Sequence, residues 1–137
     1  MALQFSVGVR NKRGNAIETE IGTAPTLQIR SGNKPAACLT ADSGSLLCTI
    51  TLPSDWYSAF AAGVGTKSGT WSGVATGAGT AGHFRIRKAG SPDSCEMQGN
   101  ITPASSSPTA EMEIDNASIA ISQTVTVTLF TITEGNA

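Results

Sequence analysis

Residues 77–90, GAGTAGHFRIRKAG, decide between two fold classes. The first six letters match the G-x-G-x-x-G fingerprint of dinucleotide-binding folds, in which glycines bring a pyrophosphate onto the N-terminus of a helix. The residues that follow alternate instead, with the apolar Phe84 and Ile86 between basic side chains. A period of two predicts a strand, which the turn signal at 90–92 ends. No helix N-terminus follows to hold a phosphate, so we interpret GAGTAG as a flexible connection between two strands.

The same alternation recurs along the chain and predicts an all-β fold. The clearest case is 46–52, where every second residue from Leu46 is apolar and Pro53 ends the strand. Shorter stretches predict further strands at 27–29, around Trp71, at 95–101 and at 112–114.

The C-terminal stretch QTVTVTLFTIT, 123–133, changes phase within itself. Val125, Val127 and Leu129 share one face, whereas Phe130 and Ile132 share the other. A one-residue shift moves every side chain across a strand, so the pattern implies a β-bulge or a change of sheet.

The N-terminal segment predicts a strand followed by a short helix. Apolar residues alternate with polar ones over 3–9, which indicates an edge strand or an extended arm within residues 1–10. Ile17 and Ile21 lie four residues apart and predict a helix from about 15 to 21, since Gly14 weakens a longer one. Seven or eight strands with at most one short helix predict a single-domain, jelly-roll-like β-sandwich over residues 1–137.

The composition indicates a protein that recognises partners by shape and apolar contact. Gly, Ala, Ser and Thr make up nearly half of the 137 residues, charged residues are 14%, and the net charge is −1. Such a charge gives no long-range attraction to nucleic acid or to an anionic membrane. The first ten residues lack the features of a signal peptide, so we expect synthesis in the cytoplasm and free thiols at Cys38, Cys48 and Cys95. A Cys38–Cys48 bridge across a turn remains open.

No residue constellation predicts catalysis, a metal site or a cofactor. His83 is the single histidine, and its phase in the strand predicts a surface position beside Arg85 and Arg87. The basic stripe of Arg85, Arg87 and Lys88 is open to contact with an acidic partner, but we interpret it as a solvated sheet face. The sequence therefore predicts a protein that is not an enzyme and needs no cofactor.

Three large aromatic residues, Trp56, Tyr57 and Phe60, crowd into a segment without a strand pattern. They either cap the end of the core or form an anchor patch for a partner. The neighbouring Asp55 also permits a carbohydrate-binding role, in which exposed aromatic rings stack on sugars.

Four stretches together resemble a family of small proteins of tailed bacteriophages and prophages, encoded near the major capsid protein. They are LPSDW at 52–56, SGTWSG at 68–73, AGTAGHFRI at 78–86 and DNASIAISQTVTVTLFTITEGNA at 115–137. The resemblance implies a virion structural protein with a jelly-roll-like fold, a decoration or cement protein on the outside of the head. It brings no catalytic residues with it.

This resemblance implies the major capsid protein and neighbouring copies of the same chain as partners, with neither nucleic acid nor membrane. The alternative is a carbohydrate-binding β-sandwich of a phage tail or fibre. Binding surfaces usually lie on termini and loops, which gives a set of candidate interface residues. These are Leu3, Phe5, Trp56, Tyr57 and Phe60.

Overall fold

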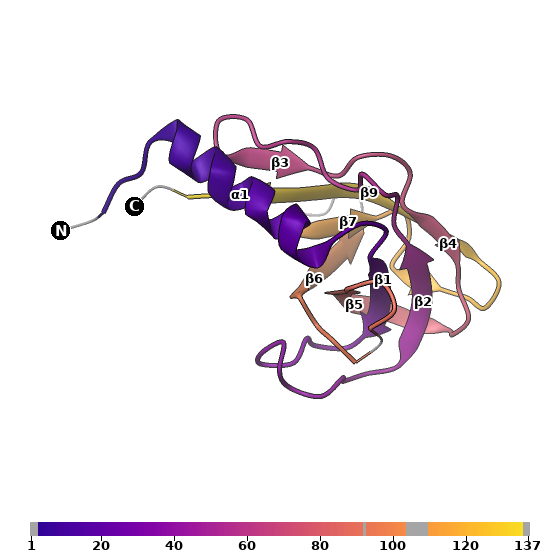
Figure 1. The fold of residues 1–137 in the computed structure, drawn as a ribbon. Helices are drawn as coiled ribbons and strands as arrows, with labels where there is room; N and C mark the ends of the chain where they lie inside the picture. Colours follow the sequence, from indigo (N-terminus) through magenta and orange to yellow (C-terminus); the bar gives the residue numbers. More distant parts are fainter. Residues whose placement is uncertain (1–2, 92, 104–109, 136–137) are drawn as a thin grey trace.

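The computed structural model describes residues 3–91, 93–103 and 110–135. Within this part of the chain, one helix packs against nine strands (Figure 1). The elements are α1 (Val7–Ile21), β1 (Thr26–Ser31), β2 (Leu46–Thr51), β3 (Val64–Thr66), β4 (Ser72–Val74), β5 (Gly79–Arg87), β6 (Met97–Pro103), β7 (Met112–Ile114), β8 (Ser118–Ile119) and β9 (Thr124–Thr133).

The strands form one curled, mixed sheet. Its order is β2-β1-β5-β6-β7-β9-β3, with β4 added to β9 and β8 added to β5. Strands β6 and β7 run parallel, and the other pairs are antiparallel. Ala75, just after β4, bridges to Cys48 of β2, and the Thr76 amide donates to the Leu47 carbonyl at 2.9 Å. The curl thus returns to β2 around one core, and the all-β, sandwich-like class with one short helix is confirmed.

The inside of the curl is apolar and rich in aromatic rings. Phe84 of β5 and Phe130 of β9 meet edge to face with ring centroids 5.7 Å apart, and Trp71 lies 5.2 Å from Phe130. Leu27 and Ile29 of β1 are fully buried beside them, as the alternation predicted. Burial of such side chains supplies most of the stabilisation of a small β domain.

The GAGTAG stretch is more ordered than the expected loose connection. Residues 79–82 already belong to β5, and that strand continues to Arg87 without any helix. A side chain at Gly82 would lie 2.1 Å from the Gly32 carbonyl oxygen. This glycine therefore serves a close approach of two backbones, and the stretch lacks the helix N-terminus that a dinucleotide needs.

The alternation of inward and outward side chains in β9 does change phase, but the change lies between Val127 and Leu129 and not, as expected, between Leu129 and Phe130. Opposite β7, the register shifts between Glu113, which pairs with Leu129, and Ile114, which pairs with Val127. Val127 and Phe130 are buried, whereas Leu129 is 41% exposed. The bulge is confirmed, but the placement of Leu129 in the core is wrong.

The N-terminal strand predicted over 3–9 is wrong, because α1 starts at Val7 and runs through the whole segment to Ile21. The Ser6 hydroxyl caps the helix by accepting from the Val9 amide at 3.3 Å. Gly14 faces the Phe60 ring, and a Cβ there would lie 2.3 Å from it. The glycine that argued against a long helix is what allows the helix to pack closely.

Candidate interaction surface

The aromatic trio is part of the core. Trp56, Tyr57 and Phe60 are 0%, 1% and 5% exposed. The Trp56 indole donates to the Gly22 carbonyl at 3.0 Å and the Tyr57 hydroxyl to the Gly65 carbonyl at 2.9 Å. Burial raises the pKa of Tyr57. These three residues therefore cap the core, and as interface candidates they are wrong.

Their burial also removes the support for the carbohydrate-binding alternative. That hypothesis depended on exposed rings beside Asp55, and the ring of Trp56 packs at a tilt against Tyr57 and Trp71 inside the protein. The sequence alone could not distinguish a cap on the core from an anchor patch for a partner, because both use large aromatic residues outside a strand pattern.

The N-terminal candidates are accessible. Leu3 is 70% exposed, and Phe5 is half-buried with its ring under the Arg13 guanidinium, 5.0 Å from the centroid. Val7 and Val9, in the first turn of α1, are 52% and 43% exposed. We call Leu3, Phe5, Val7 and Val9 the N-terminal apolar segment.

Polar contacts fix α1 to the body. The Asn11 and Asn15 side chains accept from the backbone amides of Gly63 and Phe60, each at 2.8 Å. Arg10 donates to the Glu134 carbonyl at 2.7 Å, and Arg13 pairs with the Glu134 carboxylate at 3.1 Å. In Figure 1 the N-terminal end of α1 and the C-terminal end of β9 lie on the same side of the molecule. The helix that carries Val7 and Val9 is thus fixed to the body of the protein, and Leu3 and Phe5 directly precede it.

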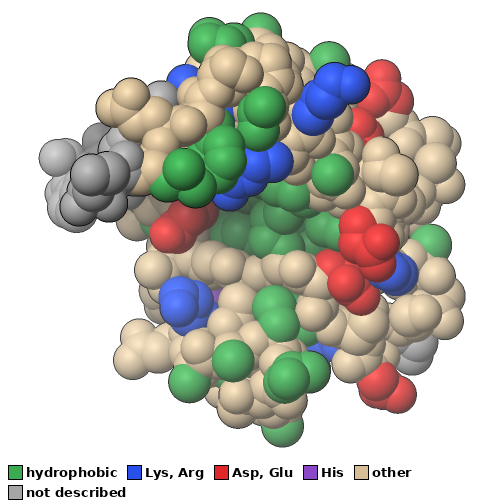
Figure 2. Space-filling view, turned by 60° about the vertical axis from the view of Figure 1, so that its left-hand side comes forward, with side chains coloured by type: hydrophobic (Ala, Val, Ile, Leu, Met, Phe, Trp, Pro, Cys, Tyr) green, Lys and Arg blue, Asp and Glu red, His purple; other side chains and the backbone are tan. Residues whose placement is uncertain are grey.

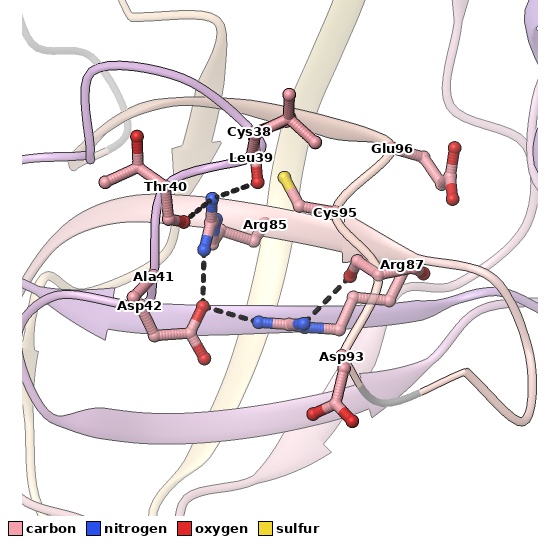
Figure 3. A pocket seen from close by; sticks show the side chains of 11 residues that line it. Cys38, Leu39, Thr40, Ala41, Asp42, Arg85, Arg87, Asp93, Cys95 and Glu96 are labelled. Carbon is pink, nitrogen blue, oxygen red and sulfur yellow. Dashed lines mark hydrogen bonds and ion pairs between the residues drawn. The ribbon is translucent and has the colours of Figure 1, made fainter.

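The basic face of β5 is buried, contrary to the sequence interpretation. His83, Arg85 and Arg87 are 0%, 2% and 3% exposed, because the connection between β1 and β2, residues 32–45, covers them. Arg85 donates to the carbonyls of Cys38 and Thr40, each at 2.9 Å (Figure 3). The prediction of a solvated face is therefore wrong.

One carboxylate serves three guanidinium groups in this cluster. Asp42 accepts from Arg85 and Arg87 and pairs with Arg30 at 3.3 Å. Burial alone would raise the pKa of Asp42, but the hydrogen bond from Arg85 and the three positive charges lower it. Guanidinium charge exceeds carboxylate charge here. Carbonyls of the covering loop accept from Arg85 and the Ser94 carbonyl accepts from Arg87, whereas the Nε of Arg85 has no hydrogen-bond partner among the described residues.

His83 lies in the same cluster as a neutral ring. Its Nδ1 is 2.9 Å from the Gly32 carbonyl, which assigns the proton to that nitrogen. Nε2 has no hydrogen-bond partner among the described residues. Burial lowers the pKa of His83, and the charges of Arg30 and Arg85 lower it further.

The covered face carries two features that sequence reasoning missed. Leu39, in the covering loop, is fully exposed. Beside it lies a cavity of about 550 Å³ whose lining includes Cys38, Arg85 and Cys95 (Figure 3). The sequence signal that could have indicated this covered face was the set of basic residues on one strand, in a chain with only 14% charged residues.

The face shown in Figure 2 is hollowed at its centre, with hydrophobic side chains on the floor and charged side chains on the rim. Separately, a groove of about 310 Å³ runs along α1, where Ala16, Ile17 and Ile21 meet Arg13, Glu20 and Glu96. Within the described residues, no group of three or more His, Cys, Asp or Glu side chains is placed to hold a metal ion.

Comparisons with protein-family models, with curated proteins and with solved structures found no match. None of the helical residues that the structure describes form a span long and apolar enough to cross a membrane.

Proposed function

We propose that this protein is a non-enzymatic structural protein of a tailed-phage virion, a decoration or cement protein that binds the outside of the assembled head. The resemblance of four stretches to a phage protein family motivates the proposal. Its partners are then the major capsid protein and neighbouring copies of the chain.

The observation that carries the proposal is the N-terminal apolar segment, of which Val7 and Val9 lie on a fixed helix and Leu3 and Phe5 directly precede it. Leu3, Val7 and Val9 are each more than two-fifths exposed. A partner that covers them gains the free energy of apolar burial. Because α1 is held by Asn11, Asn15 and Arg10, little ordering entropy is lost on binding.

Cement function requires modest binding per copy. An interface of about 1,200–2,000 Å² suffices for specific association, and attachment to two capsid subunits at once adds avidity. A ligand that binds only the assembled shell stabilises the shell by mass action. With a net charge of −1, electrostatic steering is small, so binding should survive moderate salt.

The test uses heads assembled without the protein and then incubated with it. Bound heads should break at a higher temperature than bare heads, and labelled protein should co-sediment with them. Changing Leu3 and Val7 together to Ser should weaken co-sedimentation at least tenfold, as for central interface residues.

Ile121→Ser provides the matched control. Ile121 is 65% exposed and precedes the start of β9, whereas α1 contacts Glu134 beyond the other end of that strand. This control should bind like the wild type. If bare and incubated heads break at the same temperature and no protein co-sediments, the proposal is wrong.

A further inference from the structure

The fold brings together two cysteines that are far apart in sequence. Cys38 lies in the loop that covers β5, and Cys95 lies in the connection between β5 and β6. Both thiols are half-buried, and both line the cavity of about 550 Å³. Cys48, the partner left open by the sequence, is fully buried in the core on β2.

Arg85 positions both cysteines. Its guanidinium donates to the Cys38 carbonyl at 2.9 Å and also lies against the Cys95 sulfur. The Cys95 thiol donates to the Met97 carbonyl at 3.6 Å. In Figure 3 the Cys95 sulfur points toward the loop that carries Cys38.

The electrostatics agree with this proximity. Burial and the adjacent Cys38 thiol raise the pKa of Cys95 to about 11, while Arg85 opposes this rise. Cys95 is therefore a protonated thiol at neutral pH, and it must lose its proton before it attacks a disulfide.

We propose that Cys38 and Cys95 form an intramolecular disulfide when the folded protein meets a small-molecule disulfide such as oxidised glutathione. The Cys38 thiolate attacks one sulfur of oxidised glutathione, forms a mixed disulfide and releases one glutathione thiolate. Cys95 then gives its proton to solvent and attacks the Cys38 sulfur, which releases the second glutathione thiolate. The protein loses two hydrogens, and two molecules of glutathione are formed.

The bond fastens the covering loop to the connection between β5 and β6, across the cavity. A disulfide stabilises chiefly by restricting the unfolded chain, more so for a long enclosed segment. Under the proposed virion function, the thiols would stay reduced during assembly in the cytoplasm and become oxidised after release. This timing rests on the proposed function, whereas the bond itself does not.

The test maps thiols after incubation of the folded protein with oxidised glutathione. In a Cys48→Ala variant, trypsin leaves Cys38 and Cys95 on separate peptides, since Lys67 and Lys88 lie between them. A cross-linked pair that separates on reduction is expected. In the wild type, cleavage after Asp42 separates Cys38 from Cys48 and gives the same assignment without the variant.

Oxidation should also raise Tm by about 5–10 °C in the wild type, and dithiothreitol should reverse the rise. Cys38→Ser and Cys95→Ser should each abolish both the cross-link and the rise. A stable mixed disulfide at Cys38, a cross-link through Cys48, or two thiols that still react with iodoacetamide after oxidation would each overturn the proposal. Loss of head binding with the cross-link intact would contradict only the proposed function.

Discussion

The two faces of β5 are both closed to solvent, but by different chemistry. Phe84 and Ile86 point into the apolar core, at 1% and 0% exposed. On the opposite face His83, Arg85 and Arg87 are equally buried, beneath a loop that supplies carbonyl oxygens and one carboxylate, and the Ser94 carbonyl from the connection between β5 and β6 accepts from Arg87. Alternation along a strand thus shows which side chains share a face, but not whether the second face meets water.

The two faces of β5 differ in how a substitution destabilises them. An apolar face is stabilised by burial and packing, so a truncation loses transfer free energy and leaves a cavity. A charged face depends on complete pairing, because any guanidinium without its acceptors bears a desolvation penalty. Substitutions on either face of β5 should therefore destabilise the protein.

The largest effect is expected at Phe84. Phe84→Ala removes a ring that packs edge to face on Phe130, and it should lower the free energy of unfolding by about 3–5 kcal/mol. Urea denaturation measures this value. A loss below about 1 kcal/mol would mean that the ring is not in a packed core.

The second-largest effect is expected for Asp42→Asn, on the charged face of β5. This change removes the carboxylate shared by Arg30, Arg85 and Arg87, and we expect a loss of about 1–3 kcal/mol. The value lies below that of a fully buried pair, since the Asp42 side chain is 34% exposed. The matched control is Asp55→Asn, an exposed carboxylate, which should change the unfolding midpoint in urea very little. Equal effects of the two changes would show that the cluster adds nothing to stability.

A smaller effect on stability is expected from the protonation of the buried His83, and it is measured as the pH dependence of the unfolding midpoint. The pKa of His83 is lowered in the folded protein, so below about pH 6.5 the unfolded chain binds the proton more readily. The contribution of His83 to the free energy of unfolding should therefore be fully present above that pH. It should decrease as the pH drops from about 6.5 to the lowered pKa, and below that pKa His83 should cause no further decrease. Asp42, whose pKa is lowered, acts only at more acidic pH.

His83→Asn keeps a donor for the Gly32 carbonyl but cannot take up the proton. Its unfolding midpoint should be nearly constant between pH 7 and about pH 5, where that of the wild type falls. Parallel curves for the two proteins would assign the pH dependence to another group.

Sequence patterns predicted the strands better than the helix. Alternation identifies β2, β5 and β9 because apolar side chains at alternate positions of each strand, such as Ile50, Phe84 and Val127, are buried in the core. The spacing of Ile17 and Ile21 predicted only the C-terminal half of α1. The N-terminal half has no such signal, because Asn11 and the close contact at Gly14 hold it. Tertiary contacts of this kind overrule local propensity, and only the Ser6 cap marked the true start.

The candidate surface was predicted in part. Leu3 is accessible as expected of a terminal segment, whereas the aromatic trio turned out to fill the core. The buried charge could not be foreseen, because the sequence does not show that residues 32–45 fold over β5. Three basic residues at alternate positions look the same beneath solvent and beneath a loop.

The smallest effect is expected at Leu129, on the outer face of β9. Val127 is 1% exposed, and Val127→Ala should lower the free energy of unfolding by about 1–3 kcal/mol. Leu129, brought outward by the bulge and 41% exposed, should change it by less than about 0.5 kcal/mol on Leu129→Thr, because threonine suits an exposed strand position. The contrast with β5 is the informative result: an outward residue is tolerant on β9, where Leu129 is exposed, and sensitive on β5, where residues 32–45 cover the outward side chains. If Leu129→Thr destabilises as much as Val127→Ala in the same urea titration, the outer face of β9 is covered as well, and the difference between the two strands disappears.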